Sequence, residues 1–418
     1  MITRIKYDKL FGMFDYDIQL MKDGVTIITG PNGFGKSTIL KTIDAFCSLD
    51  ILFFHRLDFN KISFFSNADD NPIEIKKEGD YIKIDSTKLD IKNLKNEIIR
   101  NRRRNYLRFS QSEWRDRRTG EIVTTDEIIK QYLQNEDLAD EIEILSDDYP
   151  ALREKIRSFS GETKFIKEQR LIKERKDREL SRYERQTINV IDELPQQVKE
   201  KIKQYSSLYS SSANQLDSTY PHRLFETKEG ITEDEYNDCL KNMNKKLEKL
   251  NKYNISDIQK PEIDVLFQEE HSKALKVYFD DFIKKYSVFE ELIDQLDLFT
   301  DIINSRLKFK EIRISREEGI EVYKLNKDEK LMLSQLSSGE KQEIILFYEL
   351  VFESDKNVHL LIDEPEISLH IAWQAMFMDD LLKIAEKKKF KVTVATHSPH
   401  IINNHWDIQI DLGELYGN

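Results

Sequence analysis

The stretch that decides the fold is VTIITGPNGFGKSTIL, residues 25–40. Its first five residues are β-branched, which is typical of a buried strand, and its last residues begin an amphipathic helix. Between them GPNGFGKS, residues 30–37, matches the phosphate-binding pattern G-x-x-x-x-G-K-[ST]. Glycines let backbone N–H groups face phosphate oxygens, and the helix N-terminus contributes the positive end of its dipole. The sequence therefore predicts a strand, a phosphate-binding loop and a helix.

The loop also predicts individual nucleotide contacts. Lys36 is expected to reach the β and γ phosphates, and the hydroxyl of Ser37 is expected to bind Mg²⁺. A glycine-rich turn without a ligand is the alternative, and the strand and helix on either side make it the weaker interpretation. The residues expected to contact the nucleotide here are Gly30, Pro31, Asn32, Gly33, Gly35, Lys36, Ser37 and Thr38.

Two later apolar strands end in polar residues. In HLLIDEPE, residues 359–366, the strand is followed by Asp363 and Glu364, and KVTVATHSPH, residues 391–400, contains His397. Ligands of parallel α/β sheets bind at the carboxyl ends of the strands. We expect Asp363 to hold Mg²⁺, Glu364 to deprotonate the attacking water, and His397 to reach a γ phosphate. Taken alone, the acidic pair could be a helix cap and the histidine structural, but the phosphate-binding loop favours the functional interpretation.

A fourth segment, LSSGEKQ, residues 336–342, precedes a strongly apolar helix. It places Ser337, Ser338 and Gly339 at a helix N-terminus, where exposed N–H groups and hydroxyls can hold an anion. Ser337 followed by Glu340 is also a good capping box. The residues alone leave both interpretations open.

Composition limits the functional classes. With 34% charged residues and a net charge of −12, the chain can bind nucleic acid only through a local basic patch. Two cysteines in unrelated contexts indicate neither a disulfide framework nor a zinc site. The N-terminus lacks a signal-peptide core, and no stretch approaches the ~18 apolar residues of a membrane span. We therefore expect a cytoplasmic protein without a membrane contact.

One basic patch is present in RNRRRNYLRFSQSEWRDRR, residues 100–118, where arginines are interleaved with Tyr106, Phe109 and Trp114. Such a mixture could follow a phosphate backbone and stack on bases. It could equally bind an acidic protein surface or be solvated structure. The arginines are Arg100, Arg102, Arg103, Arg104, Arg108, Arg115, Arg117 and Arg118.

Residue patterns divide the chain into three parts. The pattern of residues 1–172 predicts the N-terminal part of an α/β domain, with a β-rich elaboration at 51–165. The pattern of residues 308–418 predicts the C-terminal part of the same domain. In the α/β domain, strands and helices alternate as in a mostly parallel sheet that is covered on both faces. Residues 173–307 predict an insertion of amphipathic helices. Within it SSLYSSSANQLDSTYPHRLF, residues 206–225, predicts a break, which argues against a long coiled-coil arm.

Four segments resemble, in their order along the chain, the motifs of ABC-type ATPases. They are GPNGFGKST for the Walker A motif, LSSGEKQ for the signature, HLLIDEPE for the Walker B motif and THSP for the switch histidine. EPEISLH is similar to the branch that contains SMC-like, RecF-like and OLD proteins rather than to the transporters. The resemblance implies an α/β ABC-type ATPase head with ATP and Mg²⁺ as cofactors. It also implies a head-to-tail homodimer or higher homo-oligomer, in which Ser337, Ser338 and Gly339 of one copy complete the ATP site at Lys36 of another.

The resemblance further implies a glutamine that senses Mg²⁺ and the attacking water. The candidate is Gln169 in FIKEQRLI, residues 165–172, and the alternative is the charged start of a helix. As implied by the family, the catalytic set is Glu364, His397 and Gln169, and the metal set is Ser37, Asp363 and Gln169.

A narrower resemblance rests on FIKEQRL, QLDSTYPHRL, LSSGEKQ, IDEPEISLHIAWQ and THSPHIINNHWD together. This set resembles the compact ATPases of bacterial anti-phage systems, AriA of PARIS and PtuA of Septu and certain retrons. It implies an ATP-dependent sensor or scaffold that controls a separately encoded effector, a TOPRIM-type or an HNH nuclease, and answers a phage trigger protein. The last strand of the ATPase ends close to residue 418, so we expect the effector to act in trans. The alternative is a RecF/SMC-like repair or recombination ATPase that binds DNA through Arg100–Arg118.

Overall fold

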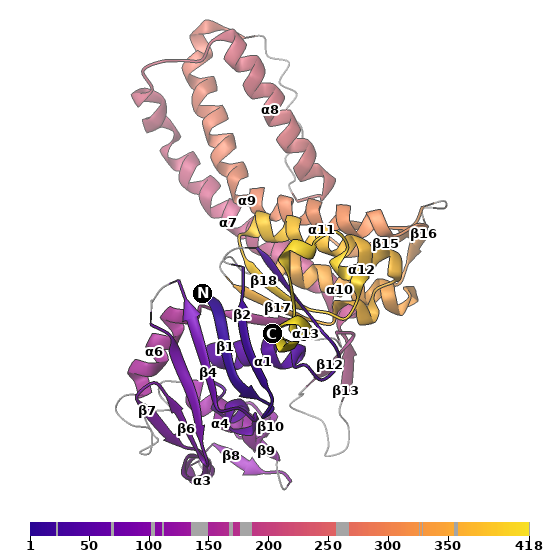
Figure 1. The fold of residues 1–418 in the computed structure, drawn as a ribbon. Coiled ribbons are helices and arrows are strands. Elements are labelled where there is room, and N and C mark those ends of the chain that lie inside the picture. The colour runs from indigo at the N-terminus through magenta and orange to yellow at the C-terminus, as the bar shows by residue number, and fades with distance from the viewer. Residues whose placement is uncertain are drawn as a thin grey trace. The chain divides into compact units, whose positions relative to one another are not determined.

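The chain forms two compact units in a computed structural model (Figure 1). Unit 1 comprises Met1–Ile188 and Glu353–Asn418, and unit 2 comprises Asn189–Phe352. The predicted domain boundaries, after residues 172 and 307, do not coincide with these limits, because residues 308–352 belong to unit 2. The structure describes residues 1–21, 24–67, 71–101, 105–110, 113–134, 149–166, 170–175, 186–255, 267–325, 327, 329–354 and 358–417.

A five-stranded sheet in unit 1 combines strands from both ends of the chain. All four strand pairs are parallel, in the order β11-β17-β18-β3-β19. Every residue of β3 and β18 is buried, as expected for parallel strands covered on both faces. This confirms the predicted α/β fold with a parallel sheet. The strands are β3 (Val25–Thr29), β11 (Thr163–Ile166), β17 (His359–Asp363), β18 (Lys391–Ala395) and β19 (Gln409–Asp411).

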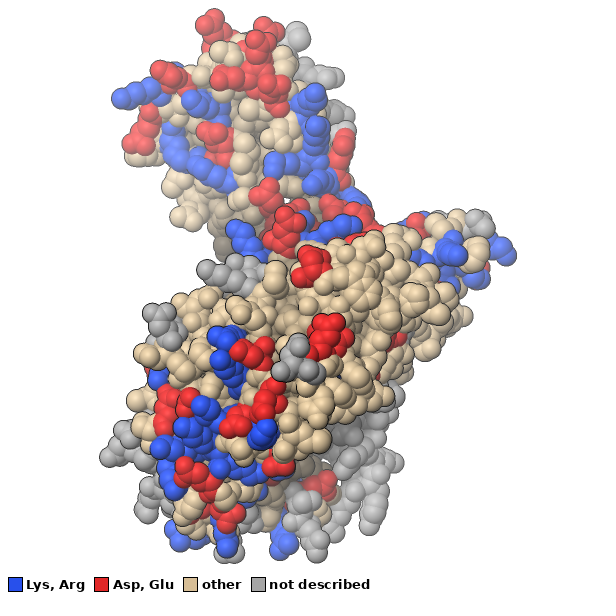
Figure 2. Space-filling model, in the orientation of Figure 1, with Lys and Arg blue, Asp and Glu red and all other residues tan. Residues whose placement is uncertain are grey.

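Helices and short turns connect these strands. Helix α1 (Lys36–Cys47) begins directly after the phosphate-binding loop and packs against β11, β17 and β18. Figure 2 shows a surface largely without charged side chains over α11 and α12, while charges of both signs are mixed over the N-terminal strands. The elements that follow β17 and β18 are η4 (Pro365–Ser368), α11 (Ile371–Lys388), α12 (Pro399–Ile402), η5 (Trp406–Ile408) and α13 (Leu412–Gly417).

The predicted β-rich elaboration is confirmed. Six antiparallel strands form a sheet in the order β2-β1-β4-β5-β6-β7, and β10-β9-β8 form a smaller one. Strand β2 alternates buried and exposed residues, so one face of the larger sheet packs on the core. The strands are β1 (Ile2–Leu10), β2 (Phe14–Gln19), β4 (Lys61–Ser66), β5 (Ile73–Glu78), β6 (Tyr81–Ile84), β7 (Thr87–Asp90), β8 (Tyr106–Arg108), β9 (Glu113–Asp116) and β10 (Ile122–Thr124).

Four helices accompany these strands, and a two-stranded ribbon completes the described part of unit 1. The rings of Phe46 on α1 and Phe64 on β4 stack at 3.9 Å, which joins the Walker A helix to the antiparallel sheet in one core. The helices are α2 (Ile51–Arg56), α3 (Ile91–Asn101), α4 (Thr125–Gln134) and α6 (Tyr149–Ser160), and the ribbon pairs β12 (Ile172–Arg175) with β13 (Gln186–Asn189).

Unit 2 contains long helices and a small antiparallel sheet. Helix α9 packs against α7, α8 and α10. Arg306 of α9 forms an ion pair with Glu343 of α10, and both side chains are almost fully buried. The elements are α7 (Val190–Glu226), α8 (Glu233–Lys252), η2 (Glu269–His271), α9 (Ser272–Arg306), β14 (Lys310–Ser315), β15 (Gly319–Lys324), β16 (Glu329–Leu331), η3 (Leu333–Gln335) and α10 (Ser338–Phe352).

The predicted break at residues 206–225 is wrong, because α7 runs through it without interruption. The hydroxyls of Ser206 and Ser210 donate to the carbonyls of Ile202 and Ser206 four residues earlier, so they do not compete with the helix. Paired along α9, helix α7 extends over 37 residues. The predicted break therefore gives no argument against a long coiled-coil arm.

The first strands after residue 308, β14 and β15, do not join the parallel sheet. Strand β14 pairs with β15, and β15 with β16, both in antiparallel register. The connection between Ser315 and Gly319 is three residues long, which permits a hairpin but not the long crossover that parallel strands need. Among the described helices, none combines the length and apolar composition needed to cross a membrane.

Candidate functional site

The phosphate-binding loop connects β3 to α1 and depends on glycine conformations. Gly30 has a φ of 142° and Gly35, the N-cap of α1, a φ of 91°, both in a region that other residues rarely adopt. A Cβ on Gly35 would lie 3.1 Å from the ring of Phe11. The loop therefore needs glycine at these positions for both conformation and space.

An aromatic cluster supports the loop from the N-terminal strands. The ring of Phe34 lies 5.2 Å from Phe14 and 5.9 Å from Tyr416. The hydroxyl of Tyr16 donates to the carbonyl oxygen of Phe34 at 3.1 Å. These contacts fix the side chain of Phe34 against the rest of unit 1.

Lys36 is 5% exposed and lies along the loop. Its Nζ donates to the carbonyl oxygens of Gly30 at 2.8 Å and Pro31 at 3.2 Å. Burial lowers the pKa of Lys36, while nearby carboxylates, Glu364 foremost, act in the opposite direction. The ammonium group is thus held at the phosphate-binding loop, where a phosphate oxygen can replace the carbonyls as its partner.

Ser37 and Asp363 lie beside each other although they are far apart in the sequence. Ser37 Oγ donates to Asp363 Oδ1 at 2.8 Å. Burial raises the pKa of Asp363, and the hydrogen bond from Ser37 opposes this shift. A hydroxyl and a carboxylate are hard oxygen ligands, so the pair fits Mg²⁺, which usually takes few protein ligands and completes its shell with phosphates and water. Among the described residues, no group of three or more His, Cys, Asp or Glu side chains is arranged to hold a metal ion.

Glu364 and His397 form the second pair. His397 Nε2 lies 3.6 Å from Glu364 Oε1, and the two side chains are 35% and 27% exposed, so water can reach both. Glu364 has a φ of 44°, a strained conformation of the kind that concentrates at functional sites. Its N–H donates to the carbonyl oxygen of Ala395 at 2.9 Å, which fixes it against the end of β18.

The structure therefore brings Lys36, Ser37, Asp363, Glu364 and His397 to the carboxyl ends of β3, β17 and β18, as predicted. Because β18 lies between β3 and β17, these three strand ends are adjacent. The arrangement offers a cation and N–H groups for phosphate, oxygen ligands for a metal ion, and a carboxylate that can accept a proton from water.

Sequence reasoning missed Glu366, two residues after Glu364. Its Oε1 accepts hydrogen bonds from Thr396 Oγ1 at 2.8 Å, His397 N at 2.7 Å and Ser398 N at 3.2 Å. Glu366 was visible as a third acidic residue in DEPE, but its partners lie thirty residues further along the chain. No local pattern indicated them.

Ser337, Ser338 and Gly339 belong to unit 2, at the start of α10. Ser337 N and Oγ donate to Glu340 Oε2 at 2.8 and 2.9 Å, and Glu340 N donates to Ser337 Oγ at 3.4 Å. Lys310 also donates to Glu340 at 2.8 Å. Burial opposes ionisation of Glu340, but the bonds from Lys310 and Ser337 leave its pKa below the usual value. The capping-box interpretation is correct, while an anion-binding role stays a prediction.

The predicted sensor glutamine lies outside the described residues, and the predicted basic patch lies partly outside them. Gln169 lies outside them, as do Arg102, Arg103 and Arg104 of the basic patch. Within the described part of the patch, Arg108 stacks on Trp114 at 5.9 Å and Arg115 on Phe109 at 5.6 Å. The patch thus presents arginines backed by aromatic rings, but its partner stays a prediction.

Residues 11–402 match the family model of the AAA ATPase domain. The chain belongs to this family. Since the match includes the Walker A, Walker B and switch-histidine segments, the ATPase binds ATP and has the machinery of its family for hydrolysis. No match is found among curated proteins.

Two solved structures are similar to this ATPase. One is the Smc head domain with an extended coiled coil bound to the C-terminal domain of ScpA, from Pyrococcus furiosus, with 13% identity over 96% of this chain and 91% of that chain and a TM-score of 0.36. The other is the SmcHead bound to the C-winged helix domain of ScpA, with 12% identity over 96% and 92% of the chains and a TM-score of 0.37.

Proposed function

We propose that this ATPase is the sensor or scaffold subunit of a bacterial anti-phage system and that its ATP cycle controls a separately encoded nuclease effector. The proposed ATP cycle is supported by two contacts at adjacent strand ends. Ser37 forms a hydrogen bond with Asp363, and His397 lies close to Glu364. The defence role is supported by the five motifs that resemble AriA and PtuA and extend along most of the chain.

Each side chain of the site has a specific part in the proposed hydrolysis. The loop N–H groups and Lys36 bind the β and γ phosphates, and Ser37 and Asp363 hold Mg²⁺, which neutralises phosphate charge when bound. Glu364 orients a water molecule and accepts its proton as the water oxygen attacks the γ phosphorus. The bond from the γ phosphorus to the bridging oxygen breaks, and the electron pair leaves with ADP. His397 donates a hydrogen bond to the γ phosphate as its charge shifts.

The ATP site is proposed to be completed by a second copy. In unit 2, Ser337 and Ser338 are exposed at the N-terminus of α10, where the positive end of the helix dipole favours an anion. In unit 1, Ile367 and Ile371 are 52% and 63% exposed just after the Walker B residues. Exposed apolar side chains beside a reactive site are typical of an interaction surface. These features support a head-to-tail dimer whose contacts include α10 of one copy and the ATP site of the other.

The central test separates ATP binding from turnover. We expect Lys36→Ala to lose nucleotide binding, because the buried ammonium is the main cation of the loop. Glu364→Gln should keep binding and lower kcat at least about 100-fold, since it removes the general base. Phosphate release and binding of a fluorescent ATP analogue measure the two effects. Full turnover in Glu364→Gln would refute the proposed mechanism.

The defence role needs a cellular test. The gene and its neighbour would be expressed together in bacteria, and plaque formation would be compared for the wild type and Lys36→Ala. We expect protection only with a functional ATP site, together with co-purification of the neighbouring product. Unchanged plaque numbers with a wide panel of phages would count against the role.

The alternative of a DNA-dependent repair ATPase is favoured by one observation, the arginines stacked on Trp114 and Phe109. It predicts that duplex or single-stranded DNA binds with a strong salt dependence and stimulates hydrolysis. Replacing Arg108 and Arg115 together by alanine should then abolish the stimulation and leave basal hydrolysis intact. Hydrolysis that does not respond to DNA favours the defence role.

A further inference from the structure

The carboxylate of Glu366 accepts hydrogen bonds from the segment that contains His397. Glu366 belongs to η4, which follows the Walker B strand, and all three donors to its Oε1 come from the three residues after β18. Two of these donors are backbone N–H groups, of His397 and Ser398. The acceptor therefore holds the main chain itself, and a different side chain at position 397 would not change these contacts.

We propose that Glu366 is a positioning residue that holds His397 beside Glu364 during ATP hydrolysis. The inference rests on the proposed role of His397 at the γ phosphate. Hydrogen bonds to an ionised carboxylate are stronger and shorter than those between neutral groups, and the 2.7 Å bond from the N–H of His397 to Glu366 is short in this sense. Glu366 Oε1 thus fixes the main chain of His397, from which the imidazole side chain extends.

The imidazole has little other support. Its side chain is 35% exposed, and the polar contact that the structure gives it is with Glu364 at 3.6 Å. By contrast, the preceding residue, Thr396, is completely buried, and its N–H donates to the carbonyl oxygen of Ile28 on β3. The chain therefore changes from the buried Thr396 to the exposed side chain of His397 within one residue. Glu366 accepts hydrogen bonds from both of these residues.

Gln374 of α11 reinforces the connection from the other side. Its Nε2 donates to the carbonyl oxygens of Glu366 at 3.3 Å and Leu369 at 3.0 Å, and its Oε1 accepts from Ser398 Oγ at 2.8 Å. Two side chains, one acidic and one amide, therefore tie the Walker B turn to the histidine segment. Any shift of η4 is transmitted to His397 through these bonds.

The charge of Glu366 gives the inference a distinctive consequence. The negative charge of Glu366 acts to raise the pKa of both Lys36 and Asp363, two groups of the phosphate site. Removing it should not weaken the binding of ATP, which is itself an anion. A positioning role then predicts that kcat falls while nucleotide affinity is maintained or increases.

The test is a double-mutant cycle of kcat with Glu366→Ala and His397→Ala in the full chain. We expect Glu366→Ala alone to lower kcat about 10- to 100-fold, by analogy with the loss found when a hydrogen-bond partner that orients a metal ligand is removed. In the His397→Ala background it should have no further effect, because it acts through His397. Glu366→Gln should retain more activity, since its amide oxygen can accept the same bonds. Glu386→Ala, an exposed glutamate on α11, is the matched control and should behave as the wild type.

Three outcomes are distinguishable. Single effects that do not add in the double variant support the inference. Effects that multiply, or a loss of ATP affinity as large as the loss of kcat, overturn it while the role of His397 stands. An unchanged kcat in His397→Ala refutes the proposed role of that residue, and the inference about Glu366 with it. Thermal unfolding of each variant shows whether the site is still folded.

Discussion

At the scale of single residues, His359 is a buried titratable group outside the ATP site. It starts β17, has no exposed surface, and its Nε2 shares a 2.8 Å hydrogen bond with Thr393 Oγ1 on β18. Burial lowers its pKa well below the usual value, and the positive charges of Lys391 and the N-terminus act in the same direction. The folded protein therefore keeps this imidazole neutral.

This neutrality predicts a pH dependence of stability. In the unfolded chain His359 takes up a proton below about pH 6.5, whereas in the folded chain it does not. Its contribution is therefore present above that pH and is lost as the pH falls, by up to about 1.4 kcal/mol per pH unit. We expect His359→Gln, which can still pair with Thr393, to reduce the loss of unfolding free energy between pH 7 and 5.5 by about 1 kcal/mol. Urea unfolding at both pH values measures it, and an identical loss in both proteins would contradict it.

Residues of the ATP site differ in how far they could be predicted. Lys36 and Ser37 follow from one local pattern, because the loop, its glycines and the helix start are consecutive. Asp363 and Glu364 required the further assumption that strand ends meet in a parallel sheet, which the structure confirms. Glu366 could not be predicted, since its role depends on a segment brought close only by the pairing of β17 with β18.

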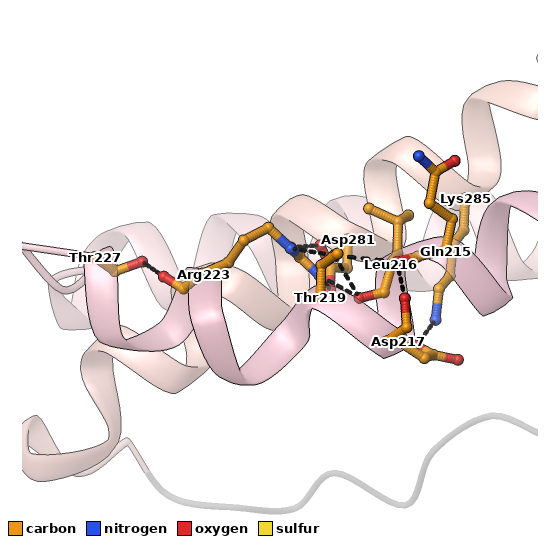
Figure 3. A network of polar contacts seen from close by, with 9 residues as sticks. Gln215, Leu216, Asp217, Thr219, Arg223, Thr227, Asp281 and Lys285 are labelled. Carbon is orange, nitrogen blue, oxygen red and sulfur yellow. Dashed lines mark hydrogen bonds and ion pairs between the residues drawn. The ribbon is translucent and has the colours of Figure 1, made fainter.

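At the scale of elements, one guanidinium group joins helix α7 to α9 close to a proline of α7. Pro221 has no N–H and so leaves the usual i to i−4 bond unmade. Arg223 donates through Nη2 to the carbonyl oxygen of Leu216 at 2.6 Å and to Asp281 Oδ2 of α9 at 2.7 Å (Figure 3). The same guanidinium thus satisfies a backbone acceptor of α7 and joins α7 to α9. The carbonyl that loses its usual donor at Pro221 is that of Asp217, so the bond to Leu216 is an additional contact and not a replacement.

The contact between α7 and β15 gives a prediction at this scale. Gly319 begins β15 with a φ of 71°, and a Cβ there would lie 2.0 Å from the carbonyl oxygen of Pro195 on α7. We expect Gly319→Ala to destabilise unit 2 by about 2–5 kcal/mol, through a strained backbone and an unavoidable clash. Urea unfolding followed by circular dichroism measures the loss.

Gly79 is the matched control for this substitution. It has a similar φ of 65°, but nothing lies within 4 Å of a Cβ at that position. Gly79→Ala should therefore cost only the left-handed backbone strain, about 1–2 kcal/mol. Equal losses for the two variants would show that the approach of Pro195 is not the cause.

At the scale of the whole molecule, the proposed dimer makes ATP binding and association interdependent. In a Glu364→Gln background we expect Mg²⁺-ATP to double the molecular mass, and Ser337→Arg to prevent this by placing a bulky cation at the α10 N-terminus. The nucleotide affinity of the monomer should change little, because Lys36 and its loop belong to unit 1. Light scattering after size-exclusion chromatography measures the mass. An ATP-bound protein that stays monomeric without the Arg substitution would refute the composite site.

Two variants control for other effects of the substitution. Ser337→Ala removes the capping hydroxyl and should cost about 1 kcal/mol of stability without preventing association. Ser210→Arg adds the same side chain to an exposed position of α7 and should leave association intact. The loss of association in Ser337→Arg should then depend on the position of the arginine, and not on its charge or on the lost cap.

The sequence by itself determined the strand, loop and helix of the ATP site, the α/β fold and the β-rich N-terminal region, because each depends on contacts between neighbouring residues or on a regular period. Only the tertiary structure decided that α7 is continuous, that β14 and β15 form a separate hairpin, and that Glu366 holds the His397 segment. These three features depend on hydrogen bonds and packing between segments far apart in the chain, or on a turn length that selects one pairing over another. The partners of α7 and of Glu366 lie far away along the chain, and a local pattern contains no information on them until the chain has folded.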